Sequence, residues 1–174
     1  MADSLIAGCL PFDYDGDGFV DLLLTGFDLS LFRNQEGAGL EEVTGAVGLD
    51  SPDCLSFSAA ACDVDGNQTL DVALGCFFQT NLITTSRNFL FINSNGETFS
   101  EEGVARGLTG GPQNGALPTY AISCLDFNGD RRSDIYEGND GWSGIPDRLW
   151  INDGNGYFSD RAEAFGLNQW WVQT

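Results

Sequence analysis

The sequence predicts an all-β chain built from three tandem four-stranded repeats. Three segments of the 174-residue chain carry the same features in the same order: an acidic run, a bulky apolar pair followed by Asn, and a tail ending in Gly-Leu. No window shows a sustained apolar period of 3.6 residues, which argues against a helical repeat. Repeated four-stranded units of this size, with 23 glycines available for tight turns, are typical of propeller blades or a related all-β array.

Local composition predicts the strands of each repeat. The first strand is rich in apolar and hydroxyl residues and precedes the acidic run, at 4–8, 56–62 and 119–124. The second strand follows the acidic run, at 21–27, 71–78 and 134–139. The third strand is apolar or alternating and meets a Gly-containing turn, at 30–34, 89–93 and 148–152. The tails, such as EEVTGAVGL, fit either a short fourth strand or one helical turn that ends at Gly.

These features divide the chain into three repeats and a short C-terminal segment. The third strands and the tails recur at intervals of 59 residues, so the length variation lies in connecting loops. The last segment carries two adjacent tryptophans, Trp170 and Trp171, which we interpret as a docking strand or interface rather than a sugar platform. The expected boundaries are 5–49, 54–108 and 117–167 for the repeats and 168–174 for the docking tail.

Charge and composition exclude several function classes. The chain has 26 acidic against 7 basic residues, a formal charge of −19, so no basic patch for nucleic acid or an anionic membrane can be assembled. It has no His, which excludes Ser-His-Asp and Cys-His catalysis and His-ligated zinc. No apolar stretch approaches the roughly 18 residues of a membrane span. The five cysteines show no metal-site spacing, and their odd number leaves at least one thiol free or paired between chains.

The three acidic runs share the pattern D-x-[DN]-G-[DN]-x-x-x-D, with side-chain oxygens at offsets 0, 2, 4 and 8. Oxygen ligands without nitrogen or sulfur favour calcium over zinc or copper, and magnesium is the weaker candidate. We expect a backbone carbonyl at offset 6 to complete each shell, as in other calcium loops. The expected ligands of three Ca²⁺ ions are Asp13, Asp15, Asp17, Phe19 and Asp21; Asp63, Asp65, Asn67, Thr69 and Asp71; and Asp126, Asn128, Asp130, Arg132 and Asp134.

Two other interpretations of the acidic runs fit less well. An EF-hand needs flanking helices and a bidentate Glu at loop position 12, which is Leu24, Leu74 and Glu137 here. Polar turns without an ion would explain one such run but not three in register. We expect the ions to be structural rather than catalytic, because the sequence places no acid or base beside them.

The acidic run, the following strand and the segments LWINDGNGYFSD and AEAFGL together resemble the FG-GAP/VCBS repeat, in the form found in ASPIC/UnbV-type proteins. The resemblance covers about 5–167 and implies blades of a calcium-bearing β-propeller like that of the integrin α-subunit head. The calcium loop of that family joins the first two strands of a blade. The sequence departs from the pattern at Gln68, where Gly is usual, and at Arg131 and Arg132, cations inside the third loop.

Propellers of this family usually have about seven blades, and three cannot close a ring. We therefore expect the chain to belong to a longer propeller, to form a six-bladed ring from two copies, or to continue head to tail into a filament. The leading function is an extracellular, calcium-stabilised scaffold or adhesion module that contacts protein or glycan. The alternative is a carbohydrate-active propeller, either a lectin or a polysaccharide lyase whose base would come from the cations or from Tyr14, Tyr120, Tyr136 or Tyr157.

Overall fold

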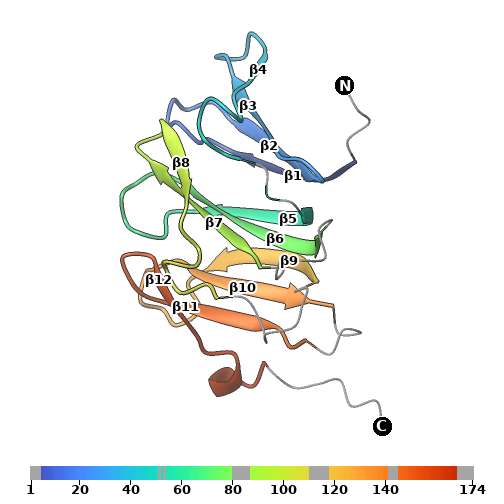
Figure 1. Cartoon of the computed structure of the whole chain (residues 1–174). Coiled ribbons are helices and arrows are strands. Elements are labelled where there is room, and N and C mark those ends of the chain that lie inside the picture. Colours follow the sequence, from blue (N-terminus) through green and yellow to red (C-terminus); the bar gives the residue numbers. More distant parts are fainter. Residues whose placement is uncertain are drawn as a thin grey trace.

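The computed structural model describes residues 5–50, 52, 54–79, 87–109, 118–140 and 145–167, so the expected docking tail at 168–174 lies outside the described residues. The described residues form three separate four-stranded antiparallel sheets (Figure 1). This architecture confirms the predicted all-β chain of three repeats. None of the helical structure in these ranges is long and apolar enough to cross a membrane.

The strands follow one another in the same order within each sheet. The first sheet contains β1 (Ile6–Phe12), β2 (Asp21–Gly26), β3 (Ser30–Asn34) and β4 (Leu40–Glu42). The second contains β5 (Cys54–Cys62), β6 (Asp71–Gln79), β7 (Phe89–Ser94) and β8 (Thr98–Glu101). The third contains β9 (Thr119–Leu125), β10 (Asp134–Asn139), β11 (Arg148–Gly154) and β12 (Tyr157–Asp160). We call each sheet, with its acidic loop and its tail, a blade.

Each acidic run forms the loop of the hairpin between the first two strands of its blade. In the first blade, the last aspartate of the loop, Asp21, pairs with Phe12, the residue just before the loop. The same pairing joins Asp71 to Cys62 in the second blade. β1 therefore extends to the loop itself, four residues beyond the predicted end at residue 8, because β2 pairs with it along that length. Strands rather than helices flank the loops, so they are not EF-hands, as predicted.

The tails combine the two structures that the sequence left open. A fourth strand forms first, after a short turn in which Asn95 and Gly96, or Asn155 and Gly156, have positive φ. Asn-Gly pairs favour this positive-φ conformation in tight hairpin turns. In the third blade the tail then ends in a short 3₁₀ helix (Glu163–Phe165) capped by a left-handed Gly166.

The sheets pack face to face in a row, with the second sheet covered on both faces (Figure 1). Because successive strand residues point to opposite faces, Val72 and Leu74 of β6 pack against the first sheet, while Ala73 between them faces the third. Burial on both faces explains the continuously apolar sequence of β6. The edge strand β5 contacts both β1 and β9 in the neighbouring sheets.

Four of the five cysteines form disulfides. Cys54–Cys76 joins β5 to β6 within the second blade, and Cys62–Cys124 joins the second blade to the third. Cys9 is a free, exposed thiol. Closing a loop as long as that between Cys62 and Cys124 is worth about 4 kcal/mol in the chain-entropy account. The sequence could not supply this pairing, because it depends on the register between neighbouring sheets.

Candidate metal centres

The last aspartate of each loop is fully buried and forms the centre of a hydrogen-bond network. In the second blade, Asp71 Oδ2 accepts the N–H of Val64 at 2.9 Å, and Asp71 Oδ1 accepts the N–H of Asn93 at 2.8 Å. One carboxylate thus ties the loop and the end of β7 to the start of β6. Asp21 and Asp134 make the equivalent pairs of bonds, to Tyr14 and Asn34 and to Phe127 and Asn152.

The first aspartate of each loop organises the turn around it. Asp13 accepts the N–H groups of Gly16 and Gly18, at 2.8 and 2.9 Å, on its two oxygens. Asp63 receives the equivalent bonds from Gly66 and Gln68, and Asp126 receives them from Gly129 and Arg131. The three loops therefore have one backbone path, as the shared spacing predicted.

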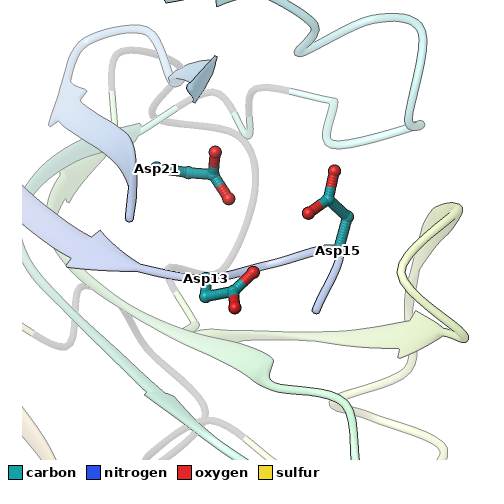
Figure 2. A group of neighbouring side chains, drawn as sticks. All are labelled: Asp13, Asp15 and Asp21. Carbon is teal, nitrogen blue, oxygen red and sulfur yellow. The ribbon is translucent and has the colours of Figure 1, made fainter. Parts of the chain in front are cut away.

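This path brings three carboxylates together in the first and second blades. Single oxygens of Asp13, Asp15 and Asp21 lie within 4.8 Å of one another, and so do oxygens of Asp63, Asp65 and Asp71. Figure 2 shows the first group: Asp13 and Asp15 follow β1, and Asp21 begins β2 on the other side of the loop. Two such groups of hard oxygen donors can each hold a metal ion.

The third loop has the same hydrogen bonds but a poorer donor set. Asn128 replaces the middle aspartate; its Oδ1 accepts the N–H of Asp130, and its amide donates to Asp130 Oδ2 at 2.8 Å. With Asp126 and Asp134, this loop offers two carboxylates and one amide oxygen at the positions that carry three carboxylates elsewhere. A third metal site here stays a prediction.

The remaining expected ligands lie beside these groups but stay predictions. At the fifth position, Asp17 Oδ1 accepts the Phe19 N–H at 2.8 Å, and Asp130 Oδ1 accepts the Arg132 N–H at 2.9 Å. Asn67 Oδ1 accepts both the N–H and the hydroxyl of Thr69, at 2.8 and 2.6 Å. In each loop, the side chain at the fifth position therefore contacts the residue two positions later, whose backbone carbonyl is the other expected ligand.

Arginines from outside the acidic pattern pair with the first two loops. Arg33 Nε lies 2.8 Å from Asp15 Oδ2, and an Arg106 amino group lies 3.4 Å from Asp65 Oδ2. In the third loop, Arg132 pairs with Asp130. Arg33 and Arg106 were missed because β3 and the second tail approach the loops only in the folded chain. These pairs offset part of the carboxylate repulsion.

Burial changes the titration of the last aspartates. Burial raises the pKa of Asp71 to about 6 from 3.8; its bonds from Asn93 and Val64 oppose this rise, and the charges of Asp65 and Asp63 add to it. Burial raises the pKa of Asp21 in the same way. A bound cation would favour the ionised form of both side chains.

This shift predicts an unusual pH dependence in the metal-free chain. Because folded Asp71 holds its proton more tightly than the unfolded chain does, its contribution to stability is full below about pH 4 and is lost as pH rises through 6. We expect the difference in free energy of unfolding between wild type and Asp71→Asn to fall by about 2–3 kcal/mol from pH 4 to pH 7. Urea unfolding of calcium-depleted protein in calcium-free buffers measures it. A difference that is constant or grows with pH contradicts the assignment.

Two loop residues adopt a backbone conformation that suits glycine. Gln68 and Arg131 have φ of 72° and 70°, where the first loop has Gly18 at 89°. Glycine would relieve the strain of the left-handed backbone, but it loses more conformational entropy on folding. The difference predicts that Gln68→Gly and Arg131→Gly each stabilise the chain by about 0.5–1 kcal/mol. The reverse change, Gly18→Gln, is the matched control and should destabilise by a similar amount. Urea unfolding would disprove this if Gln68→Gly lowered stability.

No protein-family model matches the chain, and no curated protein matches it. The repeated loop geometry and its chemistry are therefore the basis for inferring the function.

Proposed function

We propose that the chain is an extracellular, calcium-binding structural or adhesion repeat protein of the FG-GAP/VCBS kind. Each acidic loop holds one structural Ca²⁺, and the blades contact protein or glycan partners or further copies of the chain. The main support for the proposal is that the cluster of three carboxylates formed by Asp13, Asp15 and Asp21 recurs at the equivalent residues of the second blade.

The chemistry of the loops favours calcium. Three carboxylates whose oxygens lie within 4.8 Å repel one another, and a divalent cation among them converts that repulsion into attraction. The loops offer carboxylate, amide and carbonyl oxygens at irregular positions, which suits the flexible coordination of Ca²⁺ better than the octahedral geometry that Mg²⁺ demands. The chain's charge of −19 also favours cation uptake generally.

The position of the loops supports a structural role for the ion. Asp71 already links the loop and β7 to β6, so an ion held by Asp71, Asp63 and Asp65 would fix three segments of one blade together. Two disulfides are compatible with an oxidising compartment, where calcium is also abundant enough for loops of modest affinity.

A competition assay tests the metal choice. We expect titration with Ca²⁺ against a chromophoric chelator to show tight binding, and Mg²⁺ at the same concentration to compete weakly. The double variant Asp15→Asn and Asp65→Asn, which removes one partly buried carboxylate from each group, should lose most of this binding while keeping both fully buried aspartates. Equal affinity for Mg²⁺, or unchanged calcium binding by the variant, would contradict the proposal.

A carbohydrate-binding role is the second candidate, because an aromatic cluster lies across the second and third blades. The ring of Tyr120, a half-exposed side chain, lies 4.5 Å from that of Phe77 and 5.8 Å from that of Phe57, measured between centroids. Exposed aromatic faces suit sugar stacking. Glycan-array binding that Tyr120→Ala abolishes would favour this role, and an array without signal would count against it.

A lyase within that second candidate needs a base. Tyr14 is buried, and burial raises its pKa. Burial and the hydrogen bond to Asp147 raise the pKa of Tyr136 to about 12. Both shifts weigh against these two tyrosines as bases near neutral pH. Incubation with acidic polysaccharides, followed by measurement of polymer length, tests the activity directly.

A further inference from the structure

The first and second blades meet through a defined set of contacts, which we call the joint. The Phe99 N–H of β8 donates to the Val47 carbonyl of the first tail at 2.7 Å. The Asn93 side-chain amide donates to the Tyr14 carbonyl, in the acidic loop 79 residues earlier, at 2.8 Å. Gly96 lies against that loop so closely that a Cβ atom there would be 2.7 Å from the Cα of Asp15.

The second and third blades repeat the joint at equivalent residues. The Phe158 N–H donates to the Arg106 carbonyl at 2.8 Å, and the Asn152 amide donates to the Val64 carbonyl at 2.7 Å. The turn contact differs in detail: a Cβ atom at Gly156 would lie 2.5 Å from an Arg106 amino nitrogen and 3.4 Å from the Cβ of Asp65. The joint is therefore a property of the repeat, with the donors on the later blade and the acceptors on the earlier one.

The first blade presents the donor half of this joint with none of the described residues docked on it. Leu40, the equivalent of Phe99, is 53% exposed, whereas Phe99 is 5% exposed. A Cβ atom at Gly37, the equivalent of Gly96, would meet no described atom within 4 Å. The rest of this face consists of the apolar side chains of Leu22, Leu24 and Phe32, which are only partly buried. The equivalent side chains of the second blade, Val72, Leu74 and Phe91, are buried.

The third blade likewise presents the acceptor half with no other described segment packed on it. Phe165, the equivalent of Val47, is 49% exposed, whereas Val47 is 6% exposed. Phe127, the equivalent of the buried Tyr14, is also exposed, and its ring packs on Phe165 with centroids 4.8 Å apart. A Cβ atom at Gly166 would touch no described atom within 4 Å, although the equivalent Gly107 lies against the carbonyl of Phe158.

We propose that the third blade of one copy of this chain docks on the first blade of a second copy through this same joint. The occupant follows from the two open faces: each needs a partner that carries the opposite half, and a second copy carries both. Because donors and acceptors lie on different faces, neither face can dock on itself. The contact is therefore head to tail, and it either closes into a ring or continues as an open array.

This inference deepens the self-association in the proposed function and names its surface, but it does not require that the loops hold calcium. The joint between the second and third blades offers a direct test, because Cys62 and Cys124 form a disulfide across it. The position equivalent to Cys62 on the open acceptor face is Leu125, and the position equivalent to Cys124 on the open donor face is Pro11. Both residues are exposed, so substitution should leave each fold intact.

The experiment mixes Pro11→Cys and Leu125→Cys chains, both in a Cys9→Ser background, in 0.15 M salt with calcium under a mild oxidant. We expect a covalent pair at twice the 18.7 kDa chain mass, with each variant alone remaining single. Val104→Cys, an exposed position of the second tail away from the open faces, replaces Leu125→Cys as the matched control and should not link. Linkage no greater than this control overturns the proposal.

A second measurement needs no disulfide. In light scattering, Leu40→Asp and Phe165→Asp should each stay at one chain mass, whereas a mixture of the two should form pairs, because each variant retains the face that the other has lost. Wild-type protein that stays at one chain mass at high concentration, or either variant associating alone, overturns the proposal. Calcium binding is measured on the same samples, so failure of the joint and failure of the metal assignment are distinguished.

Discussion

Calcium removal should lower the melting temperature of the chain by about 20 °C. If each loop is saturated to about 100 times its dissociation constant, three ions stabilise the folded state by about 8 kcal/mol, and a chain of this length loses roughly 2–4 °C per kcal/mol. That sum is comparable to the whole stability of an ordinary domain. Thermal unfolding followed by circular dichroism, in millimolar calcium and then in excess EGTA at neutral pH, measures the change.

The double variant Asp15→Asn and Asp65→Asn is the control for this prediction. In calcium it should unfold well below wild type, and EGTA should lower its melting temperature only about a third as much, since two of its three loops have lost a carboxylate from the metal group. Restoring calcium should raise the melting temperature of wild type by about three times as much as that of the variant. A wild-type transition that EGTA leaves unchanged would mean that the loops are rigid without an ion.

Asp71→Ala should destabilise the chain by about 2–6 kcal/mol without calcium, and by more with it. The substitution leaves the buried N–H groups of Val64 and Asn93 without their acceptor, and each such loss costs about 1–3 kcal/mol. In calcium, the variant also loses a carboxylate of the second metal group. Urea unfolding in the presence and absence of calcium separates the two contributions.

Asp65→Ala is the matched comparison within the same loop. Asp65 belongs to the same metal group, but its contacts are a 3.2 Å bond from the Asn67 N–H and a partly buried 3.4 Å pair with Arg106. Without calcium its loss should cost about 1 kcal/mol, because both contacts are long and it leaves only one backbone N–H without its acceptor. Equal costs for Asp65→Ala and Asp71→Ala without calcium would contradict the structural role assigned to the buried aspartate.

The repeat and its loops are visible in the sequence because they are local. The spacing of Asp13, Asp15 and Asp21 fixes a turn through hydrogen bonds to residues within the same loop, and the apolar composition of the following strands fixes the sheets. Three copies in register made the all-β fold predictable. The bend of the chain around the first aspartate needed no knowledge of the neighbouring blade.

The features that the sequence did not provide depend on distant partners. Each third strand ends in Asn, but the bond from Asn93 to the Tyr14 carbonyl crosses to another blade. The pairs of Arg33 with Asp15 and of Cys62 with Cys124 likewise require the packed sheets. Position in the repeat also fails to predict burial, since Leu40 is exposed where the equivalent Phe99 is covered by the preceding blade.

The number of calcium ions held by the folded chain tests the central claim most directly. Native mass spectrometry of protein exchanged from millimolar calcium counts bound ions on an 18.7 kDa chain without assuming a binding model. We expect three ions per chain. The ion in the third loop, which contains Asn128, should be lost first as the calcium concentration is lowered. Fewer than three ions at saturation would contradict the claim that every blade holds its own.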